Sequence, residues 1–202
     1  MKLYFVPGTC SLAPHIVLRE AGFSFELDKM DPATRRTASG EDYLQVNPKG
    51  YVPALRLDNG QVLTEVGVVL QYLADQKPET GLAPAAGTLE RYRLMEWLSF
   101  VSSEIHKTFS PLFNPKITPE MREDRLHLLG RRLDVLAAGL GTKPFLMGKK
   151  FCVADAYLFA VLNWSHRLQV DLGKWPNLRD YLTRVSNLPS AQAAMKAEGL
   201  IK

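Results

Sequence analysis

Residues 2–29 read KLYFVPGTCSLAPHIVLREAGFSFELDK, and this stretch decides the fold. Residues 2–6 are rich in alternating aromatic and aliphatic side chains, which predicts a strand that ends at a Pro-Gly pair. A helix is expected over about 11–21, because Gly22 stands where a helix C-terminal cap belongs. A second strand is expected over 23–29. A strand, a helix and a strand in this order indicate a parallel βαβ unit.

The next fifty residues extend this unit. Residues 31–46 are polar and mixed, which predicts a loop with a short helix. An Asn-Gly pair separates 52–57 from 61–64, and Asn-Gly between alternating runs is the strongest short signal for a hairpin. Residues 65–75 have helical spacing. The predicted order over the first part of the chain is therefore β-α-β-α-β-β-α.

The second half of the sequence contains no strong strand candidate. Residues 78–87 are rich in Pro and Gly, which is typical of a linker between domains. We therefore expect one domain over 1–77 and an all-helical domain over 88–202. Helices are predicted over residues 89–109, 119–140, 155–170, 176–185 and 190–198.

The composition narrows the function classes. The chain has 202 residues, of which 46% are hydrophobic and 23% charged, and its net charge is +4 with scattered Lys and Arg. No nucleic-acid-binding pattern is present. No segment has the pattern of a membrane span or a signal peptide, so we expect a cytoplasmic protein. Two cysteines make neither a disulfide framework nor a zinc site, and no metal is expected.

Cys10 is the first candidate for chemistry. It lies between the first predicted strand and the next helix, where free N–H groups and the helix dipole favour negative charge. We therefore expect a lowered pKa for this thiol and a reactive thiolate. Ser11 beside it either donates to that thiolate or caps the helix. The other cysteine, Cys152, is expected to be structural.

Two further features could bind a ligand. Val52-Pro53 precedes the first hairpin strand, and its peptide bond is either cis or trans. A cis bond would turn the backbone of Val52 outward, free to pair with an extended peptide-like ligand. Glu65 begins a helix, where its carboxylate either stabilises the dipole or binds the ammonium of an amino-acid head group.

Motifs along nearly the whole chain resemble those of the bacterial beta-class glutathione transferases. The matching segments are 1–4, 7–13, 47–55, 63–65, 71–75, 96–98, 104–107, 154–159 and 197–200. The resemblance implies a thioredoxin-like N-terminal domain followed by an all-helical domain. It also implies a cytoplasmic homodimer that conjugates the thiol of glutathione to small hydrophobic electrophiles in detoxification, with glutathione as co-substrate and no bound cofactor. The helix over 89–109 is then expected at the dimer interface.

The resemblance also implies the roles of the glutathione site. The family's cysteine, here Cys10, contacts the glutathione sulfur and can form a mixed disulfide with it. His106 lies near the same sulfur. The backbone at Val52, before Pro53, pairs with the cysteinyl part of glutathione, and Glu65 binds its γ-glutamyl end.

Further residues follow from the same resemblance. Glu104 is expected to reach across the dimer to the γ-glutamyl end, and Ser11 and His106 to help ionise the thiol. Trp164 and His166 stand where the family lines its electrophile pocket, although a buried core tryptophan is the alternative for Trp164.

Four positions depart from the family pattern. Arg35 stands where Lys is frequent near the glycine carboxylate, and it keeps the charge. Val66 replaces Ser or Gly, so only its backbone could bind the γ-glutamyl carboxylate. Ser99 stands where Asn is common near the glutathione pocket. Cys152 replaces the Ser or Thr of a capping box that ends at Asp155, which predicts a weaker helix cap.

Two other functions remain open from the sequence. An N-terminal thiolate on this scaffold suits a glutathione-dependent disulfide reductase or peroxidase, although no second cysteine supports a dithiol cycle. A non-catalytic glutathione-binding stress protein is the other alternative, and the presence of Cys10, Glu65 and His106 argues against it. No recognisable motif indicates which electrophile is the second substrate.

Overall fold

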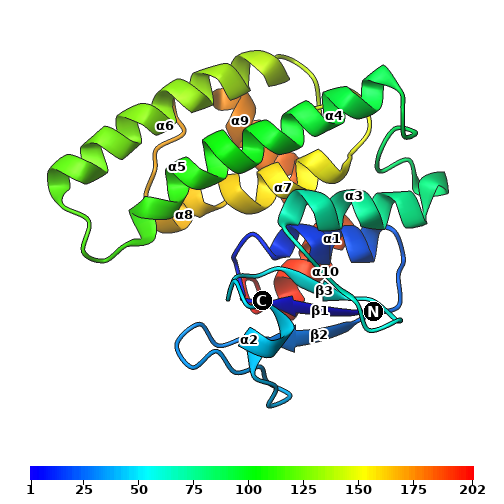
Figure 1. The fold of residues 1–202 in the computed structure, drawn as a ribbon. Coiled ribbons are helices and arrows are strands. Elements are labelled where there is room, and N and C mark those ends of the chain that lie inside the picture. The colour runs from blue at the N-terminus through cyan, green and yellow to red at the C-terminus, as the bar shows by residue number, and fades with distance from the viewer.

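A four-stranded sheet forms the base of the molecule. The computed structural model describes residues 1–202, and its strands are β1 (Lys2–Phe5), β2 (Glu26–Lys29), β3 (Ala54–Arg56) and β4 (Val62–Thr64). Their order is β2-β1-β3-β4 (Figure 1). β1 and β2 are parallel, whereas β1 with β3 and β3 with β4 are antiparallel. The sheet is mixed, and the predicted βαβ unit and hairpin are both present.

Helices cover both faces of this sheet. α1 (Leu12–Glu20) and α3 (Val66–Gln76) lie on one face, and the short α2 (Tyr43–Val46) lies on the other (Figure 1). The alternation within β1 sets this division, because Leu3 packs with α1 and α3 while Tyr4 packs with α2. The predicted order β-α-β-α-β-β-α is confirmed, and the N-terminal part is thioredoxin-like.

The rest of the chain is helical. Its elements are η1 (Pro78–Thr80), α4 (Leu89–Phe100), η2 (Val101–His106), α5 (Lys107–Phe109), η3 (Ser110–Phe113), α6 (Pro119–Leu140), α7 (Val153–Leu162), α8 (Trp164–Leu168), α9 (Pro176–Ser186) and α10 (Pro189–Ala197). Threonines begin two of these helices, since Thr88 and Thr118 each accept a hydrogen bond from the backbone N–H three residues on. None of the helices has both the length and the apolar character needed to cross a membrane.

Two predicted helices are interrupted. The helix expected over 89–109 contains a π-helical turn, η2, and π-helical turns inside α-helices are frequent at functional sites. The helix expected over 155–170 begins two residues earlier and divides at Asn163 into α7 and α8. Each interruption changes which side chains share a face of the helix.

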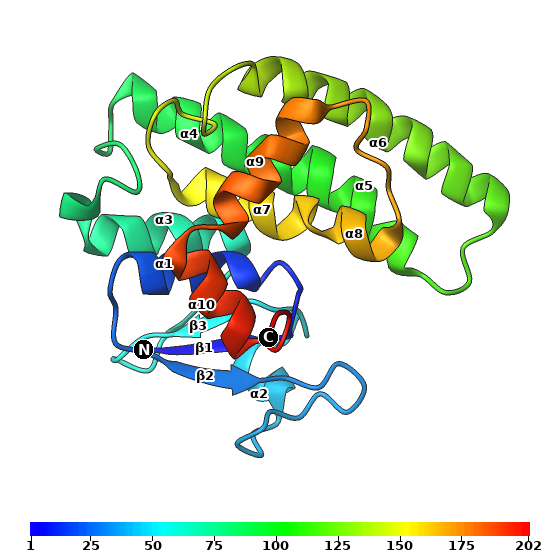
Figure 2. The same cartoon turned by 180° about the vertical axis from the view of Figure 1, so that it is seen from behind.

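The two halves share one hydrophobic core. Its largest cluster contains 46 buried residues and includes Ile16 of α1, Val69 of α3, Leu98 of α4 and Phe159 of α7. α7 is buried along its whole length. The last helix, α10, returns to the N-terminal half and lies beside α1 (Figure 2). The halves are therefore packed against each other as well as connected.

A buried arginine joins α3 to α4. Arg91 is 6% exposed and binds Asp75 through both terminal nitrogens, at 2.7 and 2.8 Å. It also donates to the carbonyl of Pro84 and to the side chain of Gln71. The carboxylate of Asp75 and the two further acceptors offset the free-energy cost of removing the guanidinium from water. This contact therefore fixes the angle between the two helices.

The start of α7 confirms the reciprocal cap expected at Asp155. Its carboxylate accepts from the backbone N–H of Cys152 at 3.0 Å, from Leu146 N–H at 2.8 Å and from the hydroxyl of Tyr181 at 3.1 Å. The thiol of Cys152 donates to the same carboxylate at 3.0 Å. Cys152 is buried and has a structural contact, as predicted.

Gly139 allows α6 to approach α4 closely. A Cβ at Gly139 would lie 2.6 Å from Cη2 of Trp97, whereas a Cβ at Gly130 would lie 3.9 Å from Cη2 of Trp175. Both glycines are half-buried and belong to the same helix. They differ in the space available to a methyl group.

We expect Gly139→Ala and Gly130→Ala to have opposite effects on stability. Alanine gains helix propensity of about 0.5–1 kcal/mol at either position, but the overlap with Trp97 costs about 1–3 kcal/mol. Urea unfolding followed by circular dichroism should show a lower midpoint for Gly139→Ala and an equal or higher one for Gly130→Ala. Equal shifts in the same direction would contradict this account of the contact between α4 and α6.

Candidate functional site

The turn after β1 is held from two sides by the second half of the chain. The N–H of Gly8 donates to Oε2 of Glu198 at 2.9 Å, and Glu198 directly follows α10. The carbonyl of Gly8 accepts from Nε1 of Trp164, in α8, at 2.9 Å. Gly8 adopts a φ of +70°, which glycine tolerates without strain. These bonds fix the segment that presents Cys10.

The carboxylate of Glu198 is itself fixed by a buried histidine. Nδ1 of His15 lies 2.8 Å from Oε1 of Glu198, and both side chains are fully buried. Nε2 of His15 accepts from Nε of Arg19 at 2.9 Å. Because Nε2 accepts, the hydrogen-bond network assigns the ring proton to Nδ1, which donates to Glu198. A chain of bonds thus runs from Arg19 to the turn at Gly8.

Cys10 is buried in the free protein and is 8% exposed. Its Sγ donates to the carbonyl of Val52 at 3.4 Å, and the Val52-Pro53 peptide bond is cis. Burial raises the pKa of the thiol to about 12, and the nearby Glu65 carboxylate adds to this rise. Backbone N–H groups and Lys107 oppose it without compensating for it. The expectation of a lowered pKa at Cys10 was wrong, because desolvation outweighs the helix N-terminus.

Ser11 does not face the Cys10 thiol as a free donor. It is fully buried, its hydroxyl donates to the carbonyl of Val6 at 3.2 Å, and the N–H of Val6 donates back to it at 3.2 Å. The hydroxyl of Thr9 lies 2.9 Å away. Ser11 also makes no side-chain cap to α1. Neither role expected from the sequence is present, and Ser11 stabilises the turn.

His106, Tyr157 and Trp164 form an aromatic cluster opposite the sheet. Nδ1 of His106 lies 2.8 Å from the hydroxyl of Tyr157, and the ring packs edge-to-face on Tyr157 and Trp164. Burial lowers the pKa of His106 to about 4, and the adjacent Lys107 lowers it further. His106 is therefore a neutral imidazole at pH 7. Trp164 is 7% exposed and also packs on Phe109 and Phe113.

One end of the sheet, where β4 finishes and β3 begins, carries the predicted head-group site. Glu65 directly precedes α3 with a φ of +69°, and its carboxylate pairs with Nζ of Lys49 at 2.6 Å. Both side chains are more than half exposed. The side chain of Val66 is buried, so only its backbone can bind a ligand. Arg35 donates to the carbonyl of Gly50, which places its guanidinium beside the same loop.

Some backbone groups at this end of the sheet are unpaired. The N–H of Val52 and those of Val66 and Gly67 make no hydrogen bond within the chain, while the carbonyl of Val52 accepts from Cys10. One end of the sheet therefore carries the Cys10 thiol, the free N–H of Val52, the N–H groups at the start of α3 and the Glu65 carboxylate. Such a row of groups can bind an extended, peptide-like molecule that carries an amino-acid head group.

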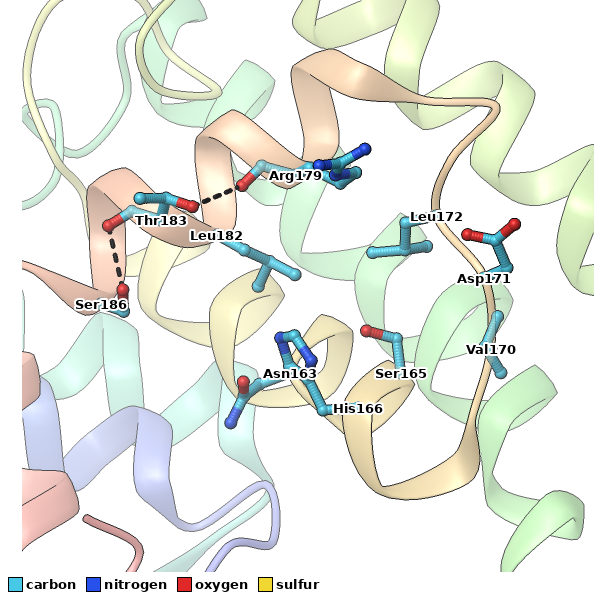
Figure 3. Close-up of a pocket in the computed structure, with 10 residues that line it drawn as sticks. All are labelled: Asn163, Ser165, His166, Val170, Asp171, Leu172, Arg179, Leu182, Thr183 and Ser186. Atoms are coloured by element: carbon cyan, nitrogen blue, oxygen red, sulfur yellow. Dashed lines mark hydrogen bonds between the residues drawn. The ribbon is translucent and has the colours of Figure 1, made fainter. Parts of the chain in front are cut away.

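Three predicted residues are not part of this group. Ser99 is exposed on α4 and lines a groove with Tyr92 and Met95. Glu104 pairs with Nε of Arg132 on α6 within its own chain. His166 lines a depression together with Leu182 of α9 (Figure 3). Because two residues along a helix point to opposite faces, His166 does not share the side of Trp164. Ser99 and His166 therefore lie away from the row around Cys10, whereas the role expected for Glu104 concerns the glutathione of the partner subunit and stays a prediction.

Sequence reasoning also missed three residues near the site. Lys49 lies in a turn motif, Lys107 follows the π-helical turn, and Tyr157 belongs to a helix that is apolar on every side. Only Tyr157 could have been identified from the sequence, since a tyrosine in a buried helix needs a hydrogen-bond partner for its hydroxyl. The structure contains no group of three or more His, Cys, Asp or Glu side chains arranged to hold a metal ion.

Comparison with known proteins identifies relatives along the whole chain. Residues 1–75 match the family described as the N-terminal domain of glutathione S-transferase, and residues 100–189 match the description of its C-terminal domain. The glutathione S-transferase GstA of Escherichia coli O157:H7 is 40% identical, over 99% of this chain and 100% of that protein.

Solved structures agree with this similarity. A glutathione transferase from Methylococcus capsulatus is 61% identical with a TM-score of 0.97, over 99% of both chains. A sphingomonad glutathione S-transferase complexed with glutathione is 47% identical with a TM-score of 0.95, over 100% of both chains. A beta-class enzyme from Sphingomonas chungbukensis is 49% identical with a TM-score of 0.95, also over 100% of both chains.

The raised pKa of Cys10 can be tested in the free protein. We expect no Cys10 thiolate absorbance at 240 nm between pH 6 and pH 9, because the folded thiol keeps its proton below a pKa of about 12. In denaturant the same thiol should ionise at its ordinary pKa of about 8.5. The signal is taken as the difference from Cys10→Ser. A transition near pH 7 that is absent in Cys10→Ser would show that the thiol is activated without ligand.

Proposed function

The chain belongs to the glutathione S-transferase family, and from that premise we propose how its residues bind glutathione and use it. It is a beta-class glutathione S-transferase that joins the thiol of glutathione to small hydrophobic electrophiles. The observation that supports the site best is the row formed by Cys10, the backbone of Val52 and Glu65. Trp164 binds the turn that carries Cys10, and His106 packs on Trp164. We assign glutathione binding to residues 1–77 and the electrophile pocket to the helical part over 88–202, joined by 78–87.

Glutathione is proposed to bind across this end of the sheet. Its cysteinyl backbone pairs with Val52, beside Pro53, as an added strand does. The carboxylate of Glu65 receives the γ-glutamyl ammonium, and the N–H groups that begin α3 at Val66 receive the γ-glutamyl carboxylate. The pair between Lys49 and Glu65 is exposed and therefore weak, so glutathione can replace it. Arg35 is assigned to the glycine carboxylate.

The thiol of glutathione is proposed to lie between Cys10 and His106. The neutral imidazole offers a hydrogen-bond partner without a competing positive charge, and Tyr157 fixes its orientation. Lys107 and the start of α1 favour the thiolate of glutathione, as they do that of Cys10. Conjugation then forms a bond between the glutathione sulfur and the electrophile and releases the leaving group. Phe113, which is 36% exposed, and the accessible part of Trp164 supply aromatic surface for the electrophile, and Phe109 packs behind Trp164.

Cys10 gives the enzyme a proposed second activity. Its thiolate attacks the glutathione sulfur of a disulfide between glutathione and another thiol, which forms a mixed disulfide of Cys10 with glutathione and releases the other thiolate. A glutathione thiolate then attacks the glutathione sulfur of this mixed disulfide, which restores the Cys10 thiolate and forms glutathione disulfide. Because the pKa of Cys10 is raised in the free protein, this step requires the thiol to ionise when ligand is bound. We place both activities in the cytoplasm, where glutathione is kept reduced.

The alternative functions are less well supported. A disulfide-bond oxidoreductase of Escherichia coli is 27% identical and a stringent starvation protein A homologue of Haemophilus ducreyi is 27% identical, both well below the 40% of the named transferase. We therefore regard disulfide exchange as an additional activity of a transferase.

The assembly is proposed to be a homodimer with α4 at its interface. Large apolar side chains are exposed along this helix, with Leu89 at 65%, Tyr92 at 56% and Met95 at 38%. Val68 of the adjacent α3 is 50% exposed. A group of exposed apolar residues of this kind marks an interaction surface, and two copies of a self-complementary patch make a symmetric dimer.

Cys10→Ala should separate the two activities. We expect disulfide exchange to fall by about a hundredfold or more, because the protein nucleophile is gone. Conjugation should fall by less than about tenfold, since glutathione supplies its own thiol. Both assays use one preparation, and Cys152→Ser is the matched thiol control that should keep both activities. Full activity of Cys10→Ala in both assays would remove Cys10 from the mechanism.

Tyr92→Arg should convert the dimer to monomer. Light scattering of the unmodified protein should give twice the chain mass of 22.6 kDa, and Tyr92→Arg should give the single-chain mass. Val135→Arg is the matched control, because Val135 of α6 is 54% exposed and lies outside the proposed interface. A monomeric unmodified protein at micromolar concentration, or equal effects of the two variants, would reject this interface.

A further inference from the structure

The carbonyl of Tyr51 and the N–H of Val52 belong to one peptide unit. The cis bond of the chain is the next one, between Val52 and Pro53, so the unit between Tyr51 and Val52 is trans. In a trans unit the C=O and the N–H point in opposite directions. The N–H makes no hydrogen bond within the chain, whereas the carbonyl accepts two. Whatever fixes the direction of this carbonyl therefore also fixes the direction of the free N–H.

Two buried side chains hold the Tyr51 carbonyl. The hydroxyl of Tyr43, in α2, donates to it at 2.6 Å, and Nδ2 of Asn47, at the end of α2, donates at 2.7 Å. Tyr43 is fully buried and Asn47 is 3% exposed, so water does not compete for the carbonyl. Burial raises the pKa of Tyr43 to about 12, and its hydroxyl therefore keeps the proton that it donates at neutral pH.

Packing and further hydrogen bonds fix both donors. The ring of Tyr43 packs against that of Tyr4 in β1, with the centroids 5.8 Å apart, in the small core between α2 and the sheet. The N–H of Asn47 donates to the carbonyl of Tyr43 at 2.8 Å. Oδ1 of Asn47 accepts from the N–H of Lys49 at 3.2 Å, which assigns the amide nitrogen to the side of the Tyr51 carbonyl. The carbonyl therefore points toward α2, and the N–H of Val52 points away from it.

The charged group of the site has no comparable support. The carboxylate of Glu65 is more than half exposed and pairs with Lys49, which is also more than half exposed. Exposed side chains lose rotamer freedom when a ligand binds, whereas a group that is already fixed does not add this cost. The N–H of Val52 is therefore oriented before a ligand arrives.

We infer that Tyr43 and Asn47 are positioning residues for glutathione, and that they orient the N–H of Val52 toward the cysteinyl carbonyl of the bound tripeptide. This inference rests on the proposed binding of glutathione at Val52. Both side chains lie on the carbonyl side of the peptide unit, so they act through the backbone and do not touch the ligand. Their hydrogen bonds also polarise the amide, which strengthens the bond that its N–H donates.

The fixed N–H selects a thiol that carries a carbonyl at the right place. The ligand must present an acceptor to the N–H of Val52 while its sulfur lies near Cys10, whose Sγ donates to the carbonyl of Val52 at 3.4 Å. A cysteinyl residue within a peptide meets both requirements, because its thiol and its carbonyl are attached to the same short carbon chain. A thiol that lacks this carbonyl leaves the N–H without a partner, and an unmade hydrogen bond lowers affinity.

Steady-state conjugation of glutathione to 1-chloro-2,4-dinitrobenzene tests the inference. Tyr43→Phe removes one donor and keeps the buried ring. We expect its KM for glutathione to rise about threefold or more, as the loss of one hydrogen bond predicts, and its kcat at saturating glutathione to stay within about twofold. Asn47→Ala removes the other donor and should raise the KM in the same way.

Tyr181→Phe is the matched control for the loss of a buried hydroxyl. Tyr181 is fully buried, and its hydroxyl donates to Oδ1 of Asp155 at 3.1 Å, in the helical half of the chain. Its removal should lower the midpoint of urea unfolding, as Tyr43→Phe should also do, but it should leave the KM for glutathione unchanged. A role of Tyr43 in stability alone would make the two variants equal in both measurements.

γ-Glutamylcysteamine, which lacks the cysteinyl carbonyl, completes the design. Its KM should exceed that of glutathione in the unmodified protein and should not rise further in Tyr43→Phe, because the acceptor for the N–H of Val52 is absent. An unchanged KM for glutathione in both Tyr43→Phe and Asn47→Ala would overturn the inference. An equal rise in Tyr181→Phe, or an equal rise with γ-glutamylcysteamine, would also overturn it. If glutathione does not saturate the unmodified protein, the proposed function is rejected, and the inference with it.

Discussion

The position of Gly8 determines the geometry of the whole site. Both of its backbone polar groups bind side chains from the far end of the chain, Glu198 on one side and Trp164 on the other. Trp164 also forms the wall against which His106 packs, so the turn that carries Cys10 and the helices that face it share one set of contacts. Glu198 has no freedom to move, because His15 holds it in a fully buried position. The nucleophile therefore belongs to an N-terminal segment whose shape is fixed by α8 and by the end of α10.

Local patterns were sufficient to predict most of the fold. The Asn-Gly pair placed the hairpin, and the change from alternating to helical spacing placed α1 and α3. The two interruptions could not be predicted. The residues of the π-helical turn, 101–106, include neither Gly nor Pro, and neither do residues 153–168, which contain the division at Asn163. Such features arise from packing against other helices, which a pattern within one segment does not record.

The chemistry of the site was predicted less well than its residue types. For Cys10 the sequence showed the helix N-terminus but not the burial that raises the pKa, and burial has the larger effect. For His166 the residue type was recognised but not the face of the helix on which it lies. Both errors concern burial and orientation, which are properties of the folded chain and not of the local sequence.

A resting cysteine that keeps its proton has a consequence for survival of the enzyme under oxidative stress. Peroxides oxidise thiolates on exposed cysteines and convert them stepwise to sulfinic and sulfonic acids, which most enzymes cannot recover. Cys10 is neither exposed nor ionised in the free protein, and Cys152 shares both properties. The chain can therefore be stored in a cell that is accumulating oxidants without losing the sulfur atom on which its exchange chemistry depends.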